Sequence, residues 1–135
     1  MVRFSEVQMT KLSAEKEAIK AVNTYIKGLN DKDPAKLVNS LHFPHIRSMK
    51  DGTFFEWHSP EEYMEAFKTR LKSSGWDHTK LINTSTEKLS ASKVHVSIEF
   101  GRYTKSGALI DNYKSLYVVI NERGYWGIKF GSGTG

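Results

Sequence analysis

The sequence predicts an α+β domain in which three helices pack on one curved antiparallel sheet. Two observations carry this prediction. Apolar residues recur at helical spacing only in the first half of the chain, within residues 14–41 and 60–71. From residue 78 onward, apolar and polar side chains alternate between short turn signals, which is typical of strands in a meander. The expected order is helix, helix, strand, strand, helix and four further strands.

Residues 14–30 form the first predicted helix, with Ser13 as its N-cap and residues 1–12 as an N-terminal extension. Its buried stripe consists of Ile19, Val22, Ile26 and Leu29. Asp33 and Pro34 provide the N-cap and first residue of a second helix. We expect this helix to bury Leu37, Val38 and Leu41 and to stop at Pro44.

A hairpin follows, because residues 45–49 and 53–57 flank the turn signal Lys50-Asp51-Gly52. A capping box with proline at the first helical position, residues 59–62, then begins a third helix. Its buried face is expected to carry Tyr63, Phe67 and Leu71.

Four long strands are predicted in the second half, over residues 78–90, 93–103, 109–121 and 125–130. The second of these alternates most clearly, with Val94, Val96, Ile98 and Phe100 on one face. Residues 131–135 are rich in glycine and are predicted to form a flexible tail. They are not expected to bind a phosphate, because no helix follows them. With no repeat and no linker, residues 1–135 are predicted to form a single domain.

The composition excludes several classes of function. The net charge is +5, but lysines and acids are interspersed without a basic block between aromatics, so we expect no nucleic-acid partner. The chain has no cysteine, which excludes disulfides and thiolate chemistry. No apolar run is long enough for a membrane span and the N-terminus does not resemble a secretory signal, so the expected location is cytoplasmic.

Two segments resemble a known superfamily. AVNTYIKGLNDKDPAKLVNSL is similar to the opening helical pair of the SnoaL-like and ketosteroid-isomerase-like proteins, and SLYVVINERGYWGIKF is similar to their last two strands. Together with the order of elements, residues 13 to 130 resemble the NTF2-like superfamily. The resemblance implies a cone in which a curved sheet wraps the helices and leaves a pocket at one end. It does not choose a chemistry, because this superfamily includes isomerases, dehydratases, cyclases and transport factors.

The resemblance also places three residues of the ketosteroid isomerase pattern. Tyr25 falls where the oxyanion-binding tyrosine lies, Met49 falls at the catalytic base, and Leu116 falls at or near the second acid. A thioether cannot abstract a proton and leucine cannot donate one, which argues against steroid isomerase chemistry by that mechanism.

The segment LHFPHIRSM carries the candidate site. Strand alternation places His45, Arg47 and Met49 on one face, and the family pattern turns that face into the pocket. In one interpretation His45 is a general base, while Arg47 and Tyr25 hold an oxyanion. In the other, all three residues are structural: His45 bonds a loose carbonyl, Arg47 pairs with an acid (Glu56 or Glu99), and Tyr25 belongs to the core.

Other candidates complete the predicted site. Trp57 and Tyr63 are expected to line the pocket mouth. His42 and His45 have a spacing that suits a metal on a helix, but Pro44 lies between them and no third ligand is evident. We therefore expect neither a metal nor another cofactor.

Aromatic residues on the last strands exceed what one face of helices can cover, so we expect a homodimer through the open face of the sheet. Three functions remain open. The first is binding of a small polar or carbonyl-bearing ligand in the pocket. The second is a lyase or isomerase reaction with His45 as the base. The third is a protein-interaction module that uses the exposed sheet.

Overall fold

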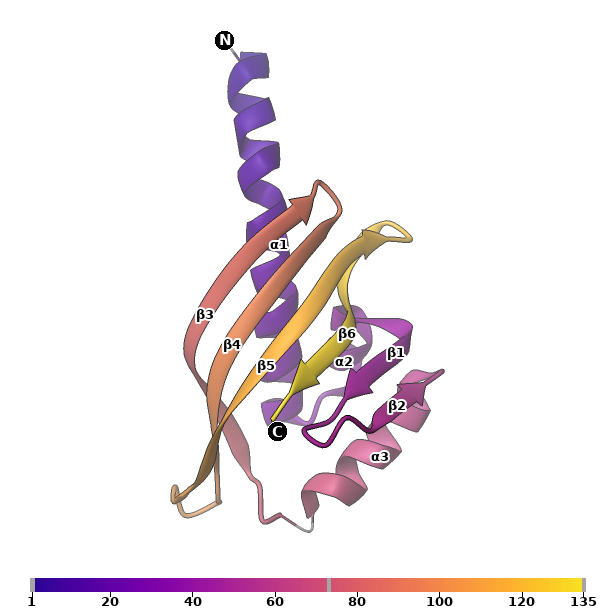
Figure 1. Cartoon of the computed structure of the whole chain (residues 1–135), viewed down its shortest axis with the longest axis vertical. Coiled ribbons are helices and arrows are strands. Elements are labelled where there is room, and N and C mark those ends of the chain that lie inside the picture. Colours follow the sequence, from indigo (N-terminus) through magenta and orange to yellow (C-terminus); the bar gives the residue numbers. More distant parts are fainter. Residues whose placement is uncertain (1, 73, 135) are drawn as a thin grey trace.

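The computed structural model describes the backbone of residues 2–72 and 74–134, and the side chains of residues 14–69 and 74–134. The helices are α1 (Val2–Asp31), α2 (Pro34–Ser40) and α3 (Pro60–Lys72), and the strands follow in two groups (Figure 1). The first group is β1 (Leu41–Ser48) and β2 (Phe54–Trp57). The second is β3 (His78–Ser90), β4 (Lys93–Tyr103), β5 (Leu109–Glu122) and β6 (Tyr125–Gly133). The predicted element order and α+β class are confirmed.

All six strands form one sheet in the order β2-β1-β6-β5-β4-β3. The long strands β3 to β6 curve around α1, which crosses the concave face of the sheet, while α3 lies beside β1 and β2 (Figure 1). The expectation of a purely antiparallel sheet needs one correction, because β1 and β6 pair in parallel. A long connection through β2, α3 and three strands separates them, so a parallel pairing is sterically accessible.

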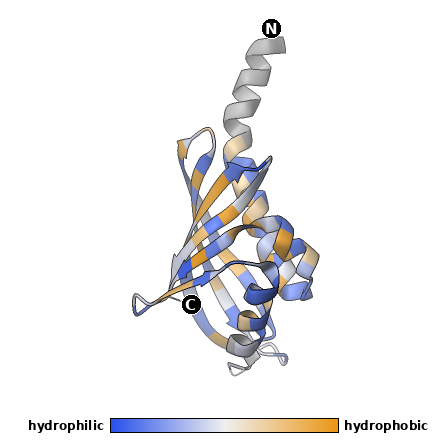
Figure 2. Ribbon diagram, turned by 90° about the vertical axis from the view of Figure 1, so that its right-hand side faces the viewer, coloured by the Kyte–Doolittle hydropathy of each residue, from blue (hydrophilic) through white to orange (hydrophobic). Residues whose placement is uncertain are grey.

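The core lies between α1 and the concave face. On β4 the side chains of Val94, Val96, Ile98 and Phe100 are buried, while the residues between them are not. The resulting alternation of hydropathy along the strands is visible in Figure 2. Val22 of α1 and Val119 of β5 are fully buried in the same core. Alternation along the sequence therefore identified the inner face of this strand correctly.

The boundary between α2 and β1 differs from the prediction. Leu41 has extended backbone angles and begins β1, so the helix ends at Ser40, four residues before Pro44. Pro44 lies inside β1 after a cis peptide bond, at the point where the register with β6 shifts. Val38, expected to be buried, is 38% exposed. A strand tolerates proline where the ladder is already interrupted, which the predicted helix stop did not consider.

Both ends of the chain also need correction. The helix α1 already begins at Val2, so Ser13 lies within it and not at its N-cap. Residues 131–133, expected to be a flexible tail, form the end of β6, where Gly131 pairs with both Tyr117 and Arg47. A bulge in β6 also turns Phe130 to the face opposite Ile128, because these residues oppose the successive positions Val118 and Val119.

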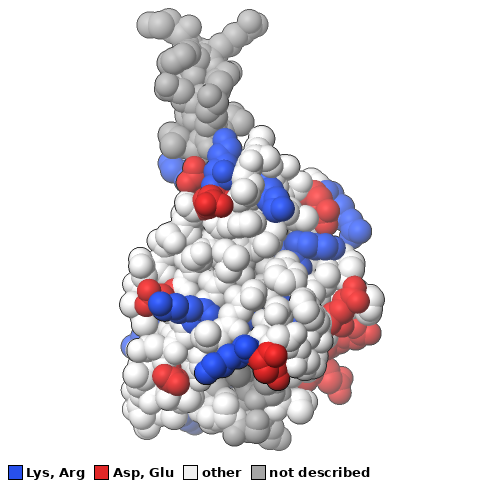
Figure 3. Space-filling model, viewed as in Figure 1, with Lys and Arg blue, Asp and Glu red and all other residues white. Residues whose placement is uncertain are grey.

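The described surface carries mixed charge. Lysines, arginines and acids are interspersed over the face in Figure 3. Among the described residues, no helix is long and apolar enough to cross a membrane.

The homodimer stays a prediction. Large apolar side chains are exposed on the outer strands, among them Phe54, Ile82 and Leu89.

Two leucines test how the core is divided between the elements. Leu37 of α2 is 2% exposed, whereas Leu109 at the start of β5 is 51% exposed. We expect Leu37→Ala to lower the free energy of unfolding by about 2–5 kcal/mol, because the side chain leaves a cavity that the core does not fill. The matched change Leu109→Ala should cost less than about 0.5 kcal/mol. Urea unfolding of both variants measures the difference, and equal losses would contradict this assignment of the core.

Candidate functional site

A cluster of polar side chains lies inside the cone, at one end of α1. It consists of Tyr25 from α1, Tyr63 from α3, Tyr117 from β5 and Arg47 from β1, and each of these residues is at most 5% exposed. The hydroxyls of Tyr25 and Tyr63 form a hydrogen bond with each other. The rings of Tyr25 and Tyr117 meet edge to face, with their centroids 5.9 Å apart. Arg47 donates hydrogen bonds to Tyr117 and, at 3.3 Å, to the hydroxyl of Ser115.

Electrostatics fix the protonation states in this cluster. Burial raises the pKa of Tyr25 well above its ordinary value, and the neighbouring phenols of Tyr63 and Tyr117 raise it further. Burial by itself lowers the pKa of Arg47, but Tyr117 and the other two phenols outweigh this effect, so the net shift is upward. At neutral pH Tyr25 is therefore a neutral phenol near the charged guanidinium of Arg47.

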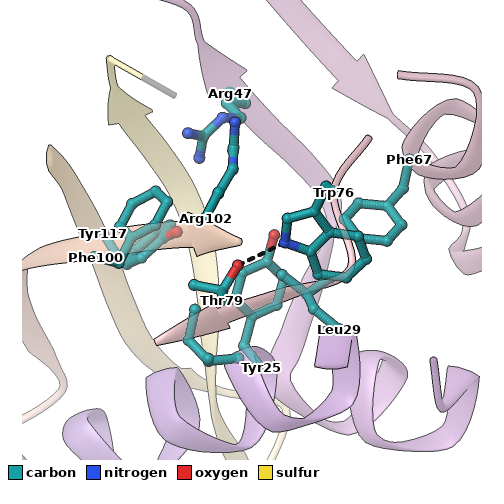
Figure 4. Close-up of a pocket in the computed structure, with 10 residues that line it drawn as sticks. Tyr25, Leu29, Arg47, Phe67, Trp76, Thr79, Phe100, Arg102 and Tyr117 are labelled. Carbon is teal, nitrogen blue, oxygen red and sulfur yellow. Dashed lines mark hydrogen bonds between the residues drawn. The ribbon is translucent and has the colours of Figure 1, made fainter. Parts of the chain in front are cut away.

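An internal cavity adjoins the cluster (Figure 4). Described residues from α1, α3, the sheet and the connection before β3 line it: Tyr25, Ile26, Leu29, Arg47, Phe67, Trp76, Thr79, Phe100, Arg102 and Tyr117. About 360 Å³ of space lies between their atoms, part of it open to solvent, but only about 20 Å³ is wide enough for the centre of a water molecule. As it stands, the cavity has room for about one ordered water.

Two half-buried side chains mark the mouth of this cavity, whereas the other lining residues are buried. Trp76 lies between α3 and β3, and its indole N–H donates to the Thr79 hydroxyl at 2.9 Å. Lys32 lies over the same indole, 5.1 Å from the ring centroid. Arg102 of β4 stacks on Tyr113, with 4.4 Å between the guanidinium carbon and the ring centroid. Trp76 and Arg102 therefore separate the cavity from solvent.

Space for the cluster comes from a glycine on β6. A Cβ atom at Gly131 would lie 3.1 Å from a terminal nitrogen of Arg47 and 3.2 Å from the Tyr117 ring. Any larger residue would push one of them out of place. The glycine-rich end of the sequence thus forms the floor under Arg47.

His45 lies beside the cavity but does not line it. Its Nδ1–H donates to the carbonyl of Ile128 at 3.2 Å, and its ring packs against Trp57 and edge to face with Tyr63. Burial, together with the charge of Arg47, lowers the pKa of His45 to about 4. A hydrogen bond to the main chain and a low basicity favour the structural interpretation of this residue.

The other predicted site residues separate into two groups. Tyr25 and Arg47 line the cavity, and Tyr63 reaches it through its hydrogen bond to Tyr25. Trp57 is buried behind His45, and Met49 lies past the end of β1 in a shallow surface depression with Lys50 and Phe55. The chain direction changes in the turn after Ser48, which removes Met49 from the inner face.

Two further expectations are corrected. The structural interpretation paired Arg47 with Glu56 or Glu99, but it donates hydrogen bonds to Ser115 and Tyr117 on β5. Leu116, placed at or near the second acid of the isomerase pattern, lies between the two and faces outward. The inward positions on either side of Leu116 hold the hydroxyl groups of Ser115 and Tyr117 and no carboxyl group.

Sequence reasoning missed Thr79, Trp76, Phe100, Arg102 and Tyr117 as lining residues. A signal for Arg102 was present, because it continues the alternation of Val94, Val96, Ile98 and Phe100 on the inner face of β4. No local pattern marks Trp76, which reaches the cavity from a connection between elements.

Both members of the histidine pair direct a ring nitrogen at main-chain carbonyls. His42 is fully buried, and its Nε2–H points at the carbonyls of Ile120 and Tyr125, at 3.2 and 3.1 Å. Among the described residues, no group of three potential metal ligands is present.

The low pKa of His45 predicts a pH dependence of stability. The folded value is about 4 and the ordinary value is 6.5, so between these pH values the unfolded chain binds more protons. Stability is therefore lost as the pH falls from 7 to 4, by about 3 kcal/mol from this residue. In His45→Asn, which retains a donor for Ile128, we expect this part of the loss to disappear.

His58→Asn is the control, because the His58 side chain is exposed. This change should leave the pH profile of unfolding as it is in the wild type. Denaturant unfolding at pH 4, 5, 6 and 7 measures all three proteins. Parallel profiles for wild type and His45→Asn would contradict the assignment.

Comparisons with known proteins agree with this architecture. Residues 16–130 match a family described as NTF2-like protein (DUF6841). No curated protein sequence matches the chain. Similar solved structures include an uncharacterised protein with a cystatin-like fold from Caulobacter vibrioides, at 12% identity and a TM-score of 0.69, covering 90% of this chain and 89% of that one.

Two further structures have the same fold. An NTF-2 like protein of unknown function from Shewanella oneidensis has 11% identity and a TM-score of 0.71, over 90% of this chain and 98% of that one. A hexachlorocyclohexane dehydrochlorinase, LinA-type3 from Novosphingobium barchaimii, has 12% identity and a TM-score of 0.72, over 93% and 88%. At such identities the likeness shows the fold alone. Because the family model spans most of the sequence, the chain belongs to the NTF2-like proteins of that family.

Proposed function

We propose that the protein binds a small molecule inside the cone, through an electron-rich oxygen such as a carbonyl or an oxyanion. The observation that carries this proposal is the convergence of Arg47, Tyr25 and Tyr117 on one internal cavity. These residues come from β1, α1 and β5, so the cluster depends on the whole fold and not on one local motif.

The cluster offers hydrogen-bond donors, so it favours a ligand that carries a hydrogen-bond acceptor. A guanidinium has only donors, and a phenol held neutral by burial keeps its proton. The hydrogen bond between the hydroxyls of Tyr25 and Tyr63 holds the Tyr25 phenol in place at the cavity wall. Such donors, fixed in a site of low dielectric, bind a carbonyl or oxyanion more strongly than they would in water.

Ligand binding requires the mouth to open, because the present space holds about one water. Trp76 belongs to a connection between elements, and its contacts with Lys32, Phe67 and Thr79 are few. Movement of the Trp76 side chain enlarges the cavity without disturbing the sheet. Segments of this kind commonly gate internal sites.

The geometry supports catalysis by His45 less well than it supports ligand binding. A base with a pKa of about 4 is weak at neutral pH, and the His45 ring lies behind the cavity wall. The dehydrochlorinase activity named for LinA-type3 belongs to that protein. For this chain, binding is the function that the geometry supports best.

A thermal-shift screen with small ketones, lactones and carboxylates tests the proposal. We expect a compound that binds in the cavity to raise the wild-type midpoint by mass action. The same compound should have little effect on Tyr25→Phe or Arg47→Met, because these variants keep most of the packed volume and lose the donors.

Tyr125→Phe is the matched control for the loss of a hydroxyl. Tyr125 donates to the carbonyl of Leu41 at 2.9 Å and does not line the cavity. Its response to the ligand should equal that of the wild type. A ligand whose shift survives both Tyr25→Phe and Arg47→Met binds elsewhere, and the proposal then fails.

A further inference from the structure

We infer that the ligand is a small monocarboxylate with a flat apolar body, whose carboxylate lies between Arg47 and Arg102. This inference rests on the proposed function and specifies the class of ligand. It comes from the second arginine of the cavity, which the sequence did not single out.

The two arginines reach the cavity from opposite parts of the concave sheet. Arg47 is on β1 and Arg102 is on β4, and strands β6 and β5 lie between them. In the pairing register Arg47 lies level with Gly131, Tyr117 and Val96, so Arg102 is three strands away and six residues further along β4. Because the sheet curves around α1, both long side chains nevertheless line the same cavity (Figure 4).

The charge around this cavity is positive. Among the described residues that line it, two are arginines and none is aspartate or glutamate. A ligand with a negative charge gains from both guanidiniums, and charge-assisted hydrogen bonds to a carboxylate are about twice as strong as neutral ones. A neutral carbonyl compound of the same shape makes weaker bonds to the same donors.

Each arginine is held in place by its neighbours. The guanidinium of Arg102 stacks on Tyr113 and also lies over Phe100, 5.5 Å from that ring centroid. Arg47 is fixed by Ser115 and Tyr117. Little side-chain entropy is therefore lost on binding, which distinguishes these arginines from flexible surface cations.

The remaining walls define the body of the ligand. Leu29 and Ile26 of α1 form one side, while Phe67, Phe100 and Trp76 contribute aromatic rings. A flat hydrocarbon ring packs well among such side chains, whereas a second charge on the ligand would be buried without a partner. A monoanion with an aromatic ring satisfies both ends of the cavity.

The experiment uses two pairs of probes at constant ionic strength: benzoate with benzamide, and phenylacetate with phenylacetamide. Isothermal titration of the wild-type protein measures the dissociation constants. We expect each carboxylate to bind at least about tenfold more tightly than its amide, since hydrogen bonds to charged groups contribute more.

Variants then assign the preference to a residue. Arg102→Gln should weaken carboxylate binding by about tenfold or more and leave amide binding nearly unchanged. Because Arg102 is half-buried at the mouth, this variant is expected to fold. Arg123→Gln is the matched control, since Arg123 lies exposed in the turn between β5 and β6 and should leave all four constants unchanged.

The outcomes separate this inference from the proposed function. Amides that bind as well as carboxylates, with Tyr25→Phe weakening both, would overturn the carboxylate assignment and leave the proposed binding site in place. A carboxylate preference that survives Arg102→Gln overturns the role of Arg102. Absence of binding by all four probes overturns the inferred ligand class, and the wider screen of ketones and lactones then decides the proposed function.

Discussion

The burial of the Arg47 guanidinium is the constraint on which the interior of this protein depends. Removing a charge from water costs several kcal/mol unless hydrogen bonds and polarisable neighbours replace the solvent. Here Ser115 and Tyr117 accept hydrogen bonds from Arg47, and the phenols of Tyr25 and Tyr63 stand near it. Residues from two helices and one strand thus surround one cation. Gly131 is equally part of this arrangement, because its missing side chain leaves the space that Arg47 occupies.

The histidines of the same strand act differently. His42 and His45 are both buried, and each donates to main-chain carbonyls of β6 or its neighbourhood. These bonds tie β1 to β6 on either side of Pro44, where the ladder is interrupted. The segment LHFPHIRSM therefore combines two tasks: its histidines hold the strand in the sheet, and its arginine serves the cavity.

Within the NTF2-like fold, the chemistry of a member is decided by side chains on the concave face, and not by the topology. In this chain the inward positions of β5 hold Ser115 and Tyr117, and the inner face of β4 ends in Arg102. The result is a cavity rich in donors and positive charge, closed by Trp76. Structural neighbours at 10–12% identity share the cone, but they do not determine what this cavity binds.

The sequence by itself determined the element order and the inner face of β4, because helical and strand periodicities are local. The inward orientation of Arg47 was predicted from the resemblance to NTF2-like proteins, because alternation alone does not say which face of a strand is buried. Prediction from the sequence failed where contacts between distant residues decide the local conformation. The strand conformation of Leu41 and Pro44 depends on pairing with β6, and residues 131–133 become a strand only because β5 and β1 flank them. Likewise, the distinction between a catalytic and a structural His45 rests on the Ile128 carbonyl, 83 residues away. The meeting of Arg47 with Arg102 follows from the curvature of the sheet, a property of the packed whole that no segment encodes alone.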